Sequence, residues 1–116
     1  MPGGYRLGAV VYHPKVEQIW RDFAAWFGGQ GFVLSPCYYE RYEDQVDALL
    51  ADRLDAAWNT NLAHVLTLQR TGGAAGALAM RDTDRGWHSR IVGLADSGVG
   101  SLEDFLGKAL CGQELF

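Results

Sequence analysis

The sequence predicts an α/β fold, a single lobe with a mostly parallel sheet of about five strands and helices on both faces. Short apolar runs alternate along the chain with longer segments in which apolar side chains recur at helical spacing. The first apolar run, residues 7–12, is continuous, which is typical of a parallel strand that is covered on both faces. Strands that alternate with helices form βαβ units with right-handed crossovers, and these units give a parallel sheet.

The first βαβ unit starts with the strand at residues 7–12. A helix is predicted to begin at His13-Pro14, where proline has no N–H group to leave unpaired, and to end at Gly28-Gly29. The apolar side of this helix consists of Val16, Ile19, Trp20, Phe23 and Phe27. The second strand is predicted at residues 31–34, before Ser35-Pro36 interrupts it.

The second helix is predicted over residues 42–54, with Val46, Leu49 and Leu50 on its buried side. The third strand, residues 54–58, ends in the polar cluster Asn59-Thr60-Asn61, from which a third helix continues to Gly72-Gly73. Two further strands are predicted at residues 77–80 and 89–94, with a polar turn at residues 82–86 between them. A short acidic helix is expected after Ser101, which caps it.

The bulk composition is that of one folded domain over residues 1–116, with 48 % hydrophobic and 21 % charged residues. The net charge is −4 and no basic cluster is present, so we expect no nucleic-acid partner. No apolar stretch reaches the length of about 18 residues that a membrane span needs. The first residues lack the features of a secretory signal, so the chain as written is expected in the cytoplasm, or in the periplasm if a signal was removed. Cys37 and Cys111 are too few for a disulfide framework.

Several segments resemble, in order and spacing, the phosphonate-type substrate-binding proteins of ABC transporters: LGAVVYHP, YEDQVDALLADRLDAAWNTNLAHV, ALAMRDTD and DSGVGSLEDFLGK. The resemblance covers about residues 6–110. It implies the type 2 periplasmic-binding-protein fold, in which a ligand lies in a cleft between two lobes. The last of these segments resembles the family's crossing to the second lobe, so the resemblance implies a truncated form that contains the first lobe only. An ABC permease is implied as a partner by family analogy alone.

The predicted ligand site lies at the carboxyl ends of the strands, because parallel α/β sheets bind their ligands there. Asn59, Thr60 and Asn61 stand at a predicted helix N-terminus, where free N–H groups favour an anion. Capping of the helix by Thr60 or Asn61 explains the same residues equally well. Tyr12 and His13 occupy the equivalent end of the first strand, and the resemblance implies that they line the cleft; a surface turn is the alternative.

The resemblance implies a phosphonate, phosphate-like or other small oxyanion as the ligand. Binding is expected to be weak, because one lobe provides half of a cleft. No cofactor is expected. No metal site is expected either, since His64 and His88 lack partners at ligand spacing and residues 82–86 lack the carboxylates of a calcium loop. For Tyr38, Tyr39 and Tyr42, packing against a helix is favoured over a place in the wall of the cleft.

Two other interpretations stay open. A homodimer that acts as an interaction or regulatory module is favoured by the apolar side chains that a missing second lobe would leave exposed. These are Trp20, Trp26, Trp58 and Trp87, with Leu110, Leu115 and Phe116 in the tail. A small flavodoxin-like enzyme would need a base with a partner, for which the candidates are His13 with Asn59 or Asn61. Since no nucleophile motif is present, we expect that the chain is not an enzyme.

Overall fold

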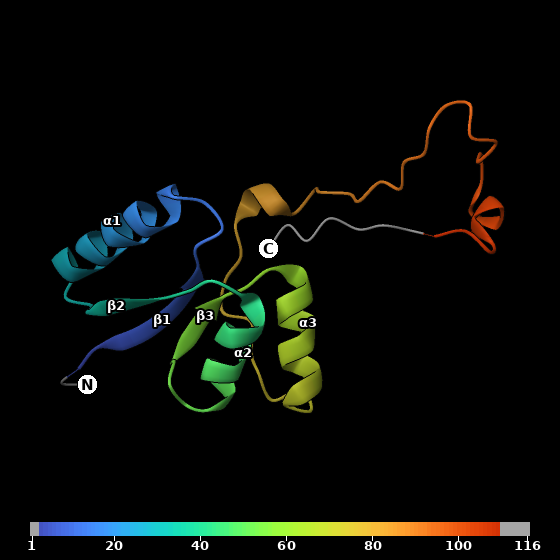
Figure 1. Cartoon of the computed structure of the whole chain (residues 1–116). Coiled ribbons are helices and arrows are strands. Elements are labelled where there is room, and N and C mark those ends of the chain that lie inside the picture. Colours follow the sequence, from blue (N-terminus) through green and yellow to red (C-terminus); the bar gives the residue numbers. More distant parts are fainter. Residues whose placement is uncertain (1–2, 110–116) are drawn as a thin grey trace. The chain divides into compact units, whose positions relative to one another are not determined.

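The computed structural model describes residues 3–109 of the chain. The elements in chain order are β1 (Tyr5–Val10), α1 (Lys15–Gly29), β2 (Leu34–Tyr39), α2 (Tyr42–Leu50), β3 (Ala56–Trp58), α3 (Asn61–Arg70), and the short 3-10 helices η1 (Asp82–Asp84) and η2 (Leu102–Phe105) (Figure 1). The chain forms two compact units: the first extends to Gly76 and holds the sheet, and the second begins at Ala77. Within the described residues, no helix is both long enough and apolar enough to cross a bilayer.

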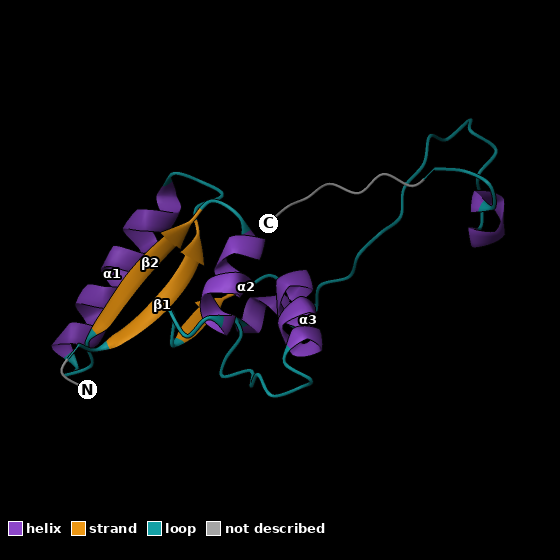
Figure 2. Ribbon diagram, turned by 60° about the horizontal axis from the view of Figure 1, so that its bottom comes forward, coloured by secondary structure: helices purple, strands orange, loops and turns teal. Residues whose placement is uncertain are grey.

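The sheet has the strand order β2-β1-β3, and both pairings are parallel (Figure 2). β1 is the central strand, and its Leu7 lies opposite Pro36 on one side and Ala56 on the other. The last three residues of β1, Gly8 to Val10, are buried, as the continuous apolar run predicts. The predicted α/β class with a parallel sheet is confirmed.

Helices cover both faces of this sheet (Figure 1). α1 carries the chain from the central strand to the β2 edge, and α2 carries it back across β1 to the β3 edge. Because these two crossings run in opposite directions and crossovers are right-handed, the two helices lie on opposite faces. α3 packs beside α2. The core between these two helices and the sheet contains Val10, Tyr42, Val46 and Ala63.

The predicted number of about five strands is wrong for the described residues, in which the sheet has three. Residues 77–80 and 89–94 form no strand, and every one of them is exposed. Leu78 and Val92 expose 88 % and 82 % of their surfaces. An apolar run becomes a strand when it finds a partner strand and a core in which to bury its side chains, and these runs find neither.

β2 also differs from the prediction, since it starts at Leu34 and continues through Pro36 to Tyr39. Proline has no N–H group to donate, but β2 is an edge strand that pairs with β1 alone, so one side of its backbone needs no partner. Of the predicted residues 31–33, Gly31 and Phe32 bond back to the end of α1, and Val33 leads into β2. Gly31 has a φ of 82°. This left-handed conformation favours glycine.

The second unit contains the polar turn predicted at residues 82–86 and the short acidic helix predicted after Ser101. Arg81 and Asp84 form an ion pair of 2.9 Å across η1, which confirms the polar turn. The carboxylate of Asp104 accepts hydrogen bonds from the backbone N–H groups of Gly100 and Ser101 at 2.8 and 3.0 Å, and these bonds close the predicted cap of η2. The tail with Leu110, Cys111, Leu115 and Phe116 lies outside the described residues.

Candidate functional site

The candidate site lies at the carboxyl edge of the sheet, where β1 ends at Val10 and β3 ends at Trp58. The two strands are parallel neighbours, and Ala9 pairs with Trp58. The segments Tyr12-His13 and Asn59–Asn61 therefore leave the sheet at the same edge, as expected for a doubly wound sheet. Their role in ligand binding stays a prediction.

The loop from β3 to α3 carries the predicted cap. The Thr60 hydroxyl oxygen accepts a hydrogen bond from the N–H of Ala63 at 3.3 Å, and its backbone carbonyl accepts one from the N–H of His64 at 2.9 Å. The capping role of Thr60 is thus confirmed. Within residues 3–109, no hydrogen bond is found for the N–H groups of Asn61 and Leu62, which belong to the first turn of α3. Together with the helix dipole, these groups make the loop favourable to an anion.

Gln45 anchors this loop from inside α2, and its side chain is completely buried. Its amide nitrogen Nε2 donates to the carbonyl of Trp58 at 2.9 Å and to Oδ1 of Asn59 at 2.8 Å. Its oxygen Oε1 is buried and lacks a hydrogen-bond partner among the described residues. An unpaired buried oxygen costs about 1–3 kcal/mol. The two hydrogen bonds from Nε2 to the loop form in spite of this cost.

Sequence reasoning missed Gln45, because a single amide in an amphipathic helix is ordinarily assigned to the exposed side. The spacing from Tyr42 was the available signal. Gln45 and Val46 follow Tyr42 by three and four residues, so both lie on the same face of α2 as Tyr42. The structure buries all three. Leu50, predicted to face inward, is instead 37 % exposed at the end of the helix.

The comparison with known families gives one match. The profile of a family described as ABC transporter, phosphonate, periplasmic substrate-binding protein matches residues 11–114, nearly the whole chain. The chain belongs to this family. The resemblance to this family is thereby confirmed, and the matched range includes both segments at the carboxyl edge. No curated protein and no solved structure matches the chain significantly.

In this member of the phosphonate-binding family, Tyr12 and His13 are both exposed. His13 Nδ1 accepts a hydrogen bond from the N–H of Lys15 at 3.1 Å, so the imidazole is held by the backbone at the start of α1. Within residues 3–109, no hydrogen bond joins His13 to Asn59 or Asn61, and the oxygen of Asn59 is bound by Gln45 instead. The pair that an enzyme would need is not formed there.

Tyr42 connects the candidate site to the core. The residue is 8 % exposed and packs with Val10, Val46 and Ala63. Burial raises the pKa of the Tyr42 phenol, and the nearby phenol of Tyr12 adds to this rise. Tyr42 therefore stays neutral at physiological pH and brings the end of β1 into contact with the first turn of α3.

Tyr38 has a different role. Its hydroxyl donates to the backbone carbonyl of Glu17 at 3.2 Å and thereby joins β2 to α1. Burial raises the pKa of Tyr38 as well. The predicted packing of this tyrosine against a helix is confirmed.

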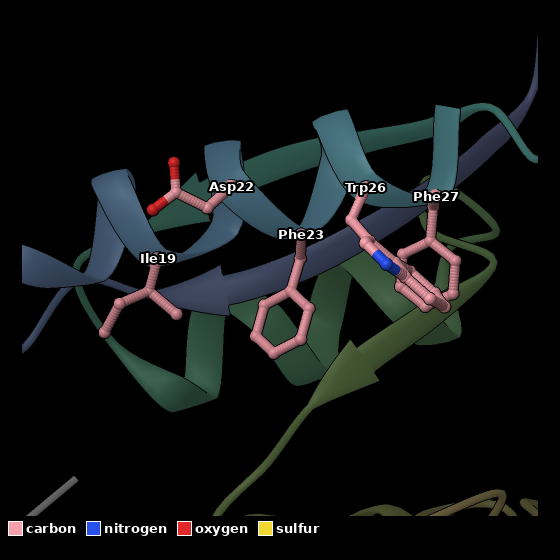
Figure 3. Close-up of a pocket in the computed structure, with 5 residues that line it drawn as sticks. All are labelled: Ile19, Asp22, Phe23, Trp26 and Phe27. Atoms are coloured by element: carbon pink, nitrogen blue, oxygen red, sulfur yellow. The ribbon is translucent and has the colours of Figure 1, made fainter. Parts of the chain in front are cut away.

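A hollow of about 500 Å³ lies beside α1, and its lining includes neither Tyr12-His13 nor Asn59–Asn61. Figure 3 shows its lining: the apolar side chains of Ile19, Phe23, Trp26 and Phe27 point to one side of α1, and Asp22 points to the other. The lining is almost entirely apolar, so the hollow offers little to bind an oxyanion. Within residues 3–109, no group of three or more His, Cys, Asp or Glu side chains is placed to hold a metal ion.

Proposed function

We propose that residues 1–116 act as one lobe of a solute-binding protein that holds a phosphonate or phosphate-like oxyanion at the carboxyl edge of its sheet. The observation that supports this proposal most directly is the loop before α3. It combines the helix N-terminus, the unpaired N–H groups of Asn61 and Leu62, and the side chains of Asn59 and Thr60. All of these can donate hydrogen bonds to an anion.

The residues of the proposed site have distinct tasks. Because the Thr60 oxygen accepts from Ala63, its hydroxyl hydrogen is available to the ligand. Tyr12 and His13 would approach the anion from the neighbouring strand end, with a phenol and an imidazole as further hydrogen-bonding groups. A single wall buries little of a ligand, so we expect dissociation constants of about 1 mM. By family membership, the partner would be an ABC permease and the compartment the periplasm.

Calorimetric titration tests the proposal. Methylphosphonate, phosphate and sulfate should bind, and Thr60→Val, which removes the hydroxyl and keeps the shape, should weaken binding by about tenfold. Gln69→Ala is the matched control, since Gln69 is exposed near the other end of α3 and should leave binding unchanged. Saturable, selective binding of an uncharged apolar compound in place of these anions would overturn the proposal.

A homodimer is the second candidate function, and the apolar side of α1 favours it. Ile19, Phe23 and Trp26 line the hollow of Figure 3, and each of them exposes close to half of its surface or more. Exposed apolar patches of this kind mark interaction surfaces. Trp20 and Trp58, predicted as part of the patch, instead pack edge to face at 5.9 Å and are half-buried. Leu110, Leu115 and Phe116, which were also predicted as part of the patch, lie outside the described residues.

Sedimentation tests the dimer. The double variant Phe23→Glu/Trp26→Glu should convert dimer to monomer, because two charges in the interface would lack partners. Ala25→Glu places the same charge on the other side of α1 and should leave the dimer intact. A wild-type protein that sediments as a monomer at every concentration would exclude this candidate.

A further inference from the structure

The orientation of two side-chain amides, that of Gln45 in α2 and that of Asn59 in the β3–α3 loop, follows from one backbone group. The carbonyl of Trp58 can accept hydrogen bonds and cannot donate them, and it lies 2.9 Å from the end of the Gln45 side chain. The atom of Gln45 that faces it must therefore be the nitrogen. The second hydrogen of that nitrogen points to Asn59 at 2.8 Å, so the atom of Asn59 that receives it must be its oxygen.

The opposite arrangement of the two amides is disfavoured. If Gln45 turned its oxygen outward, two oxygens would face each other at the Trp58 carbonyl at 2.9 Å, and the buried NH₂ group beside Gly8 would lose both of its present acceptors. Asn59 has no such constraint of its own. Its nitrogen Nδ2 has no hydrogen-bond partner within residues 3–109 and is not fully buried, so solvent reaches it.

We infer that Gln45 is a positioning residue for the oxyanion site, which turns the oxygen of Asn59 inward and its NH₂ group toward the ligand. This inference rests on the function proposed above and adds a basis for its specificity. With Asn59 held in this way, the loop presents hydrogen-bond donors from Asn59, Thr60 and the first turn of α3. An Asn59 oxygen on the ligand side would repel an oxyanion at the same distance. Gln45 therefore acts through Asn59 and does not touch the ligand.

The orientation can be tested on the full chain by NMR without any ligand. The two side-chain NH₂ protons of Gln45 should be protected from hydrogen exchange, because both are bonded and buried. Those of Asn59 should exchange rapidly. Protection of the Asn59 protons in place of the Gln45 protons would overturn the inference, whatever the protein binds.

The effect on the ligand is tested with methylphosphonate. Gln45→Met keeps the length of the side chain and removes its donor, so the Asn59 amide should lose its fixed orientation. We expect the affinity to fall by about fivefold to tenfold, and the NMR shifts of the Asn59 NH₂ protons to move toward those of an unconstrained asparagine side chain. Gln69→Met, the same substitution at an exposed position of α3, should change neither.

The possible results separate the two proposals. If Gln45→Met folds and binds methylphosphonate as tightly as wild type, the positioning role is overturned while the proposed function stands. If wild type binds none of the oxyanions, the proposed function fails, and the exchange pattern still decides the amide orientation. If Gln45→Met does not fold, two measurements on wild type decide the inference. The first is the exchange pattern, and the second is the shift of the Asn59 NH₂ signals during titration with methylphosphonate. Signals that do not move on binding overturn the inference.

Discussion

At the level of single residues, Gly8 lies where the central strand packs closely against the side chains of Leu54 and Gln45. A Cβ atom at this position would lie 2.6 Å from Cδ1 of Leu54 and 3.0 Å from Oε1 of Gln45, and both of these side chains are buried. Overpacking of a filled core costs about 1–3 kcal/mol. The absence of a side chain at Gly8 therefore allows Gln45 to reach the loop that it anchors.

The variant Gly8→Ala should lower the free energy of unfolding by about 1–3 kcal/mol, measured by urea denaturation. Gly28→Ala is the control, because Gly28 lies in α1 and a Cβ atom there would meet nothing within 4 Å. That substitution should stabilise the protein by about 0.5–1 kcal/mol. An equal effect of the two substitutions would contradict the close packing at Gly8.

Asp55 gives a pH-dependent prediction at the same scale. The Arg6 guanidinium donates two hydrogen bonds of 3.1 Å to this carboxylate, and the backbone N–H of Arg6 donates a third. These bonds lower the pKa of Asp55 from its ordinary 3.8 to about 2, and the bonds from the guanidinium contribute most to this change. The stabilisation is thus fully present at pH values above the ordinary pKa of 3.8, and it is lost as the pH falls through the pKa of about 2 in the folded protein.

Wild type should accordingly be more stable than Asp55→Asn above about pH 5, and the difference should shrink between about pH 4 and pH 2. Denaturant titrations across this range measure it. In an Arg6→Met background, most of the difference should disappear, since the guanidinium bonds are then absent. A difference that stayed constant down to pH 2 would show that the ion pair does not form.

At the level of elements, α3 depends on the cap that also forms part of the proposed site. Thr60→Ala removes the bond to the N–H of Ala63 and should cost about 1 kcal/mol of stability, read from thermal unfolding. Thr60→Ser keeps the hydroxyl and should retain both stability and anion binding. If Thr60→Ala were as stable as wild type, the 3.3 Å bond would contribute little to the helix.

At the level of the whole molecule, the two units differ in how they are stabilised. The first unit has the parallel sheet, three helices and the buried core. In the described part of the second unit, from Ala77 to Ala109, the regular elements are η1 and η2, and no residue there is fully buried. Segments without a buried core open with little cost in free energy.

Limited proteolysis with trypsin should show this difference. Cleavage after Arg85 and Arg90, which lie in the exposed part of the second unit, should precede cleavage after Arg53 and Arg70, and a fragment that contains the sheet should persist. Mass spectrometry identifies the order of the cuts. Resistance of Arg85 and Arg90 would show that another surface covers this segment, and a dimer would be the first explanation to examine.

The sequence by itself determined the parallel α/β class, the three helices and the family. Each of these depends on patterns that are local in the chain: the apolar run of β1, the helical spacing of apolar residues and the ordered motifs. The cap at Thr60 was open to prediction for the same reason, since a helix N-terminus needs its partner within three residues. The turn at η1 and the cap of η2 are local in the same way.

Tertiary structure alone decided which apolar runs became strands and which amide holds the loop of the proposed site. Residues 77–80 and 89–94 have the composition of strands, but strand formation requires a partner edge that no local pattern specifies. Gln45 gains its role from a carbonyl and an amide 13 and 14 residues away, which reach it because the β3–α3 loop folds back onto α2. The space for Gln45 exists because residue 8 of β1 is a glycine. The role of Gln45 thus depends on β1, α2 and the β3–α3 loop together, and these three segments meet only in the folded chain.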